Sequence, residues 1–143
     1  MYTNNYLLNV YELVGSADTT VFEGFDGVIG DTGKPLPDGW TGIVNGSYIS
    51  TQSSGVSIPS IRLGNTGEYL QTKSYPHPVK SLSFMYRFPS SGTGSYFILQ
   101  AFTGENWEKI DSVAYSNTSK YYPAYSFSVE DNVTAFRITY YKV

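Results

Sequence analysis

The chain has 143 residues, with nine Lys and Arg against 12 Asp and Glu, one His and no Cys. Its length fits one domain with a core of its own, and the absence of Cys excludes a disulfide framework and a thiolate metal site. A net charge of -3, without any run of Lys or Arg, excludes the basic surface that binding to nucleic acid requires.

Apolar and β-branched residues alternate with polar ones along most of the chain, which predicts strands rather than helices. In chain order, the expected strands cover residues 6–14, 21–25, 48–51, 60–63, 68–73, 81–88, 96–103, 107–113, 125–129 and 134–142. About ten short strands, separated by turns rich in Gly, Pro, Asn and Ser, predict an all-β fold. The architecture that we expect is an antiparallel β-sandwich of jelly-roll type.

The alternation also predicts which side chains are buried. In residues 81–88 and 134–142 one face of each strand is apolar, so we expect that face to be covered, with Arg137 and Tyr141 pointing outward. Residues 96–103 are apolar on both faces, which suits a central strand covered on both sides. The expected core contains Phe22, Phe25, Leu82, Phe84, Ile98, Phe136 and Ile138.

The sequence predicts two segments and no targeting signal. The opening residues 1–5 contain no cation and lead into broken apolar stretches, so we expect no signal peptide and no membrane insertion. A small, polar stretch at residues 15–20 separates an N-terminal strand or anchoring segment, residues 1–20, from the expected jelly-roll domain, residues 21–143.

Short aromatic and glycine motifs carry a resemblance to a known family. The motifs are FEGFD at 22–26, LPDGW at 36–40, PSIRL at 59–63, LSF at 82–84, the hairpin at 104–107 and FRITY at 136–140. Over residues 21–142 the chain resembles the choice-of-anchor J or cleaved-adhesin domains, which are MAM-like jelly-roll modules of surface proteins. The resemblance implies attachment to a glycan or another surface, and a location on the cell exterior.

The chain departs from this family at its end. Family members continue beyond the strand equivalent to residues 134–142 into one more strand, whereas this sequence stops at Val143. An unpaired edge exposes backbone groups and has to be covered. We therefore expect residues 6–14 to pair beside residues 134–142, either in their own chain or in a neighbouring copy or assembly partner.

The resemblance also implies a structural Ca²⁺ in some relatives. In this sequence the matching carboxylates are Glu23 and Asp26. Calcium takes about six to eight oxygen ligands, and this sequence lacks the acidic pair that family members carry on their further strand. The alternative is that both carboxylates face solvent or accept hydrogen bonds from a neighbouring turn; no other cofactor is expected.

A cluster of tyrosines is the candidate ligand-binding site. Tyr121, Tyr122 and Tyr125 lie around Pro123, and exposed tyrosines suit either a protein interface or stacking on a sugar ring. The alternative is that these side chains only line the sheet faces. We assign Trp40 and Trp107 to core or hairpin packing.

Nothing in the sequence predicts an enzyme. The carboxylates that could act in general acid and base catalysis lie in turns or on a polar hairpin face, and no local pattern selects a pair: Asp31, Asp38, Glu105, Glu108 and Asp111. His77 stands between two prolines, without a Ser or Asp partner at a recognisable spacing.

Two functions of different classes stay open. The first is a non-catalytic interaction module that mediates adhesion to a glycan or protein surface, as the resemblance implies. The second is a structural component of an assembly, such as a phage virion decoration or auxiliary capsid protein. In the second, residues 6–14 anchor the chain and the sandwich is displayed.

Overall fold

The computed structural model describes residues 10–14, 19–25, 36–48, 59–88, 93–115, 124–128 and 132–143. All regular structure in these residues is β-strand, and they form no helix. The strands are β1 (Val10–Val14), β2 (Thr19–Glu23), β3 (Thr41–Ile43), β4 (Ser47–Tyr48), β5 (Ser60–Ile61), β6 (Tyr69–Gln71), β7 (Val79–Met85), β8 (Tyr96–Phe102), β9 (Trp107–Ala114), β10 (Ala124–Ser128) and β11 (Ala135–Tyr141). The all-β prediction is confirmed for this part of the chain.

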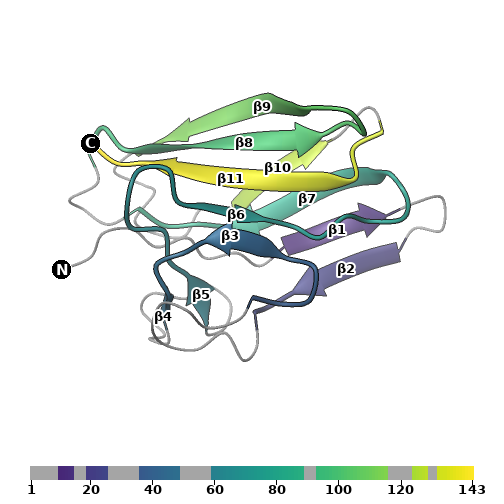
Figure 1. Ribbon diagram of the computed structural model, residues 1–143, viewed down its shortest axis with the longest axis horizontal. Helices are drawn as coiled ribbons and strands as arrows, with labels where there is room; N and C mark the ends of the chain where they lie inside the picture. The colour runs from purple at the N-terminus through teal and green to yellow at the C-terminus, as the bar shows by residue number, and fades with distance from the viewer. Residues whose placement is uncertain are drawn as a thin grey trace.

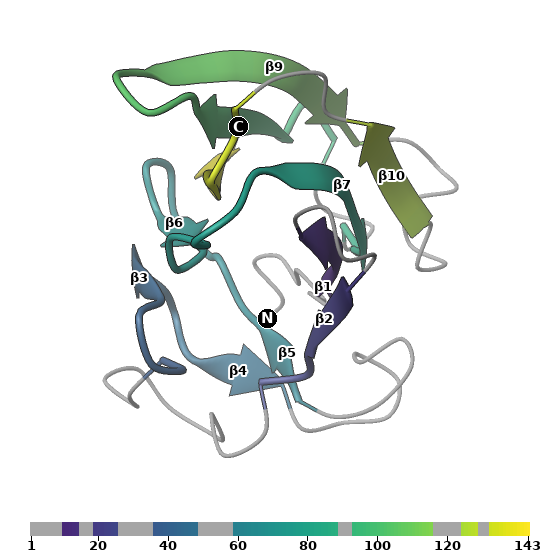
Figure 2. The ribbon, with the colours of Figure 1, turned by 90° about the vertical axis from the view of Figure 1, so that its right-hand side faces the viewer.

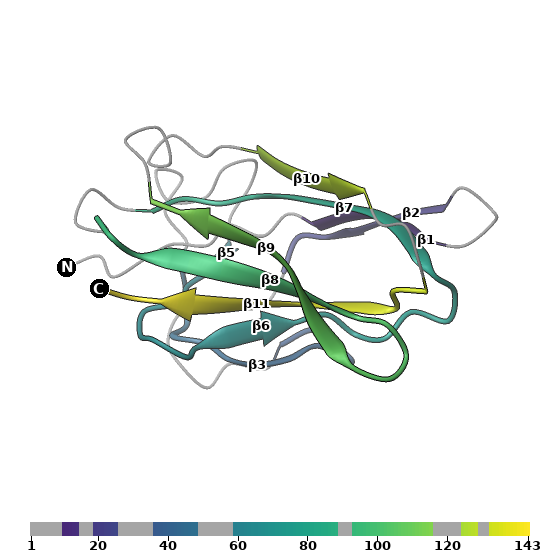
Figure 3. The same ribbon diagram turned by 90° about the horizontal axis from the view of Figure 1, so that it is seen from above.

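The strands form two larger sheets and one small pair, all antiparallel. The five-stranded sheet has the order β3-β6-β11-β8-β9, the four-stranded sheet has the order β10-β7-β1-β2, and β4 pairs with β5. Figure 1 shows the five-stranded sheet from β9 at the top to β3 below. In Figure 2, β3 and β6 lie on the left, whereas β10, β1 and β2 lie on the right. Figure 3 shows β10, β7 and β2 above β8, β11 and β6.

The core forms where the inward side chains of β7 meet those of the five-stranded sheet. The ring centroids of Phe84 and Phe97 lie 5.9 Å apart, and Phe88 stacks on Phe97 at the same distance. The predicted core residues Phe25, Leu82, Phe84, Phe136 and Ile138 are all at most 5% exposed. The predicted alternation in residues 81–88 and 134–142 is thus confirmed, while the side chain of Phe22 lies outside the described residues.

The prediction that Ile98 is a core residue is wrong. Phe97 and Leu99 of β8 are fully buried, but Ile98 points to the opposite face of the sheet and is only half-buried. Its cross-strand partner Thr139 is half-buried too. Strand β8 therefore has one buried face rather than two. The side chain of Ile98 on the outer face is partly covered by its neighbours in the same sheet, which is why an apolar residue can lie there.

The N-terminal strand pairs within its own chain, but not where the sequence predicted. Strand β1 lies between β2 and β7, with Glu12 opposite Val21 on one side and Leu82 on the other. Strand β11 is flanked by β6 and β8, so the open edge expected beside residues 134–142 does not exist. Pairing at residues 10–14 is confirmed, its expected place is corrected, and residues 6–9 lie outside the described residues.

Two further pairings differ from the sequence expectation. Strand β5 pairs with β4, whereas β6 pairs with β3 and β11, so the turn at residues 64–67 connects two sheets instead of closing a hairpin. Strand β3 was not predicted, because its three residues include Gly42 and show no alternation of apolar and polar side chains. The hairpin between β8 and β9 is as predicted.

A tight turn places Trp40 in the core. The backbone N–H of Trp40 donates to the carbonyl of Pro37 at 2.9 Å, and Gly39 between them has a φ of +81°. A Cβ at Gly39 would lie 2.8 Å from Cβ of Lys73, so the turn requires glycine. Trp40 is 7% exposed and packs edge-to-face on Phe25, with 5.1 Å between the ring centroids. Its assignment to the core is confirmed.

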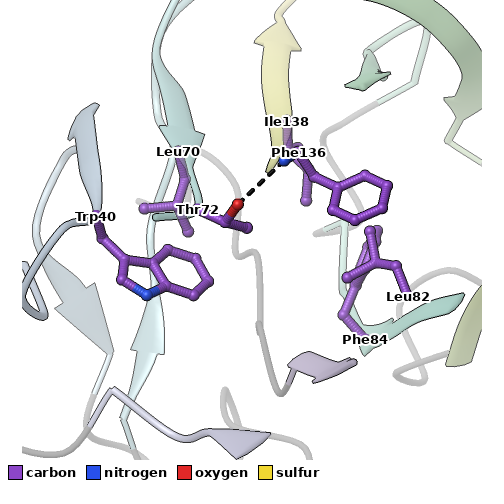
Figure 4. A pocket seen from close by; sticks show the side chains of 7 residues that line it. All are labelled: Trp40, Leu70, Thr72, Leu82, Phe84, Phe136 and Ile138. Carbon is purple, nitrogen blue, oxygen red and sulfur yellow. Dashed lines mark hydrogen bonds between the residues drawn. The ribbon is translucent and has the colours of Figure 1, made fainter. Parts of the chain in front are cut away.

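A small cavity lies inside this core, beside Trp40 (Figure 4). Its lining residues are Trp40, Leu70, Thr72, Leu82, Phe84, Phe136 and Ile138. The only polar group among these side chains besides the indole N–H is the Thr72 hydroxyl. Its Oγ1 accepts from the N–H of Phe136 at 3.0 Å and donates to the carbonyl of Lys73 at 2.9 Å. The cavity is therefore a packing gap with an engaged hydroxyl and not a polar binding site.

The Thr72 hydroxyl makes a testable contribution to stability. In Thr72→Val the buried N–H of Phe136 loses its side-chain acceptor, which we expect to cost about 1–3 kcal/mol in the free energy of unfolding. Thr72→Ser keeps the oxygen and removes only a methyl group, so urea denaturation should give a smaller loss for Ser than for Val. The opposite order would show that the methyl group, and not the hydrogen bond, matters at this position.

Candidate functional site

The predicted tyrosine cluster lies mostly outside the described residues. Tyr121 and Tyr122 fall in a part that the structure does not describe. Tyr125 belongs to β10, where its backbone lies opposite Phe84, but its side chain is not described either. The tyrosine cluster stays a prediction.

The candidate calcium ligands are divided in the same way. Asp26 lies outside the described residues, whereas Glu23 ends β2 and is half-buried. Its Oε1 accepts a hydrogen bond from the backbone N–H of Phe25 at 2.6 Å. Phe25 has a φ of 58°, which is strained for a bulky residue, so this carboxylate stabilises a tight turn. Calcium binding at Glu23 and Asp26 stays a prediction.

The other acidic residues and His77 are spread over different elements. Asp38 lies in the turn before β3, Glu105 in the β8–β9 hairpin and His77 between β6 and β7, and all three are exposed. Asp31 lies outside the described residues, and Glu108 and Asp111 belong to β9. Burial, and secondly the charge of Asp111, raises the pKa of Tyr86. In the described part of the chain no three His, Cys, Asp or Glu side chains come together.

A different set of side chains gathers on the outer face of the five-stranded sheet. In β11 the buried residues Phe136, Ile138 and Tyr140 alternate with half-buried ones, and the half-buried ones face away from the core. Directly paired residues of antiparallel strands share a face. The outer face therefore carries Thr41, Ile43, Tyr69, Gln71, Tyr96, Ile98, Gln100, Phe102, Trp107, Lys109, Ser112, Ala114, Arg137, Thr139 and Tyr141.

Arg137 is the centre of one group on this face. Its guanidinium carbon lies 4.1 Å from the ring centroid of Trp107 and 5.4 Å from that of Tyr69. Its Nε and Nη2 both donate to Oε1 of Gln71, at 3.0 and 2.8 Å. Trp107 also packs on Phe102, with 5.3 Å between the ring centroids. We call these five residues the Arg137 platform.

The order of the strands explains how the Arg137 platform forms. Arg137 lies on the central strand β11, directly opposite Gln71 of β6 and Gln100 of β8. Trp107 lies on β9, two strands away, opposite Phe102. A long guanidinium side chain can cover that distance along the sheet surface and hold its charge over the ring, where the cation is attracted to the aromatic face.

A second aromatic pair lies toward the other end of β11. Tyr96 and Tyr141 are directly opposite each other on β8 and β11, and their rings stack with 4.9 Å between centroids and 11° between planes. Ile98 and Thr139 lie between this pair and the Arg137 platform. The outer face thus carries aromatic rings toward both ends of β11, with polar side chains between and beside them.

The charges on the outer face are all positive. Arg137 and Lys109 occupy outer positions, whereas no Asp or Glu does so in the described strands β3, β6, β8, β9 and β11. Neither cation is in an ion pair with a described carboxylate. The face is locally cationic, although the whole chain carries a net charge of -3.

Sequence reasoning anticipated part of this face. Alternation alone placed Arg137 and Tyr141 outward, which the structure confirms. Trp107 was assigned to core or hairpin packing, and it does pack on Phe102 across the hairpin, but it also carries the guanidinium of Arg137. The missing signal was the non-local strand order that brings residues 69, 107 and 137 together.

Comparison of the chain with family models, curated proteins and solved structures gives no match. The resemblance to choice-of-anchor J modules accordingly stays a prediction from the motifs that carry it. In the described residues no helix is long and apolar enough to cross a membrane.

Proposed function

We propose that this chain is a non-catalytic interaction module, a jelly-roll β-sandwich that attaches to a glycan or another surface. The observation that carries the proposal is the Arg137 platform, in which a guanidinium lies over the rings of Trp107 and Tyr69 on the outer face. Rigid rings with polar neighbours bind partners at low entropic cost, and Trp, Tyr and Arg are the residue types that dominate binding surfaces. Such a module acts where it is displayed, on a cell surface or a virion.

The pairing of β1 favours this function over the anchored assembly component. In the assembly version residues 6–14 hold the chain to a neighbour. The backbone of β1, however, is paired on both sides within its own chain, with β2 and with β7. A strand with two in-chain partners has no open edge to offer, so the described part of residues 6–14 supports the interaction module.

Binding to a panel of immobilised polysaccharides and cell-surface preparations tests the proposal. We expect Trp107→Ala to weaken the binding by about thirtyfold, since truncating a central aromatic residue costs about 2 kcal/mol. Met85→Ala, a truncation at a half-buried position of β7 in the other sheet, should leave binding unchanged.

Two results would contradict the proposal. If no member of the immobilised panel retains the wild-type chain, the chain is not an attachment module. If Trp107→Ala binds as well as the wild type, the outer face is not the binding surface. Polysaccharides incubated with the chain should also gain no new reducing ends, because the module is non-catalytic.

A further inference from the structure

The outer face has a charge that selects among partners. Arg137 and Lys109 are its charged residues, and the carboxylates of β9 lie elsewhere: Asp111 is paired with inward-facing Leu99, and Glu108 with buried Ala101. A partner that complements this face is therefore anionic. A second copy of the chain would bring the same two cations against themselves, and like charges in contact disfavour that pairing.

The Arg137 guanidinium has a fixed orientation that suits binding of a carboxylate. The two bonds to Gln71 orient it, and its central carbon lies 4.1 Å from the ring centroid of Trp107 and 5.4 Å from that of Tyr69. Gln71 is a neutral partner, so the positive charge is not compensated, and the guanidinium has more N–H donors than the two that Gln71 accepts. A planar guanidinium matches a carboxylate through two parallel hydrogen bonds.

The neighbours of Arg137 favour a sugar as the bearer of that carboxylate. A pyranose ring offers an apolar face for stacking and hydroxyls around its edge. Trp107, Phe102 and the stacked Tyr96 and Tyr141 supply ring surfaces along β8, β9 and β11. An acidic peptide that bound as an added strand would pair with an edge strand, β3 or β9, and not with β11, which carries Arg137 and is paired on both sides.

We infer that the outer face of the five-stranded sheet binds an acidic saccharide, with Arg137 binding its carboxylate and Trp107 stacking on its ring. Lys109 on the edge strand β9 adds a second positive charge on the same face. The inference rests on the proposed function and narrows it to one class of glycan. Because Lys109 is exposed, its contribution should be weak and sensitive to salt.

Three probes test the inference on the full chain. Polygalacturonate carries a carboxylate on each ring, its fully methyl-esterified form keeps the rings and loses the charge, and poly-L-glutamate keeps the charge without rings. We expect polygalacturonate to bind about thirtyfold more tightly than either of the other two, because the methyl ester loses about tenfold from Arg137 and threefold from Lys109, and poly-L-glutamate loses the stacking on Trp107. The preference should decline as salt is raised from low ionic strength.

Matched variants assign the effect to residues. Arg137→Gln should reduce polygalacturonate affinity about tenfold, to within about threefold of the methyl ester, and should lower the methyl ester affinity much less. Lys109→Gln should reduce it about threefold without altering thermal stability, because Lys109 is exposed. Lys80→Gln removes the same charge from an exposed position of β7 in the other sheet, and should have no effect.

Each of the following results would refute a different part of the proposal. Equal binding of polygalacturonate and its methyl ester, without dependence on Arg137 or Lys109, refutes the acidic ligand and leaves the attachment function standing. Equal binding of poly-L-glutamate refutes the saccharide. A solution dimer that Arg137→Gln dissociates would identify a second copy as the occupant. Failure to bind any polysaccharide or surface of the wider panel refutes the proposed function itself.

Discussion

Replacing Phe84 or Phe136 by alanine is expected to lower the free energy of unfolding by about 3–5 kcal/mol. Both rings are at most 2% exposed, and they come from the two different sheets, on β7 and β11. Both also line the cavity beside Trp40, so truncation would enlarge a gap that already exists. Urea denaturation of each variant against the wild-type chain measures the loss.

Ile43→Ala is the matched control for these truncations. Ile43 is 61% exposed on β3, so its removal should change the free energy of unfolding by less than about 0.5 kcal/mol. Ile98→Ala should fall between the two, because Ile98 is half-buried on the outer face. A loss below about 1 kcal/mol for Phe84→Ala and Phe136→Ala would show that these residues do not face the core.

The facing of single strands could be read from the sequence because side-chain direction in a strand has a period of two. Leu82 and Phe84, and likewise Phe136 and Ile138, are buried as that period predicts. The period of two does not show whether the second face of a strand that is apolar on both faces is covered. Ile98 on β8 was expected in the core for this reason and is only half-buried. An outer-face residue can be apolar because Tyr96 and Tyr141 lie beside it in the sheet and not because another layer covers it.

The order of strands within a sheet could not be derived in the same way. Local alternation carries no information about which strand pairs with which. The place expected for residues 6–14, beside residues 134–142, came from the strand that this chain lacks relative to the resembled family, and the structure places β1 between β2 and β7 instead. The structure instead pairs β11 with β6 and β8, and adds the three-residue β3 at the edge. Strand β3 is stabilised by pairing with β6, and its own composition, which includes Gly42, did not predict it.

The candidate site could not be predicted from the sequence for the same reason. Arg137 could be placed on an outward face, but Tyr69, Gln71 and Trp107 reach it only through the order β6-β11-β8-β9. The sequence drew attention to Tyr121, Tyr122 and Tyr125 instead, since they are close along the chain. Closeness along the chain identifies loop clusters, whereas a binding face on a sheet is assembled from distant residues.

Deleting residues 1–15 is expected to abolish the soluble folded protein. The deletion removes β1 from the interior of the four-stranded sheet, so β2 loses its only described partner strand and β7 gains an open edge beside Leu82 and Ser83. An open edge of a hydrophobic sheet pairs with other chains. Because the free energy of unfolding of a domain is only about 5–15 kcal/mol, the loss of the β1–β2 and β1–β7 hydrogen bonds should be enough to unfold the chain. Circular dichroism and light scattering should show lost structure and aggregation.

A pair of point variants separates the backbone of β1 from its side chains. Glu12 lies at the middle of the strand, opposite Val21 and Leu82, so Glu12→Pro removes an N–H from an internal strand and should lower the melting temperature strongly. Glu12→Thr changes the same side chain, keeps the N–H and has high strand propensity, so it should melt close to the wild type. A soluble, folded monomer after deletion of residues 1–15 would contradict in-chain pairing, and would return residues 6–14 to the role of an anchor for a neighbouring chain. The two outcomes differ in solution mass, which sedimentation measures directly.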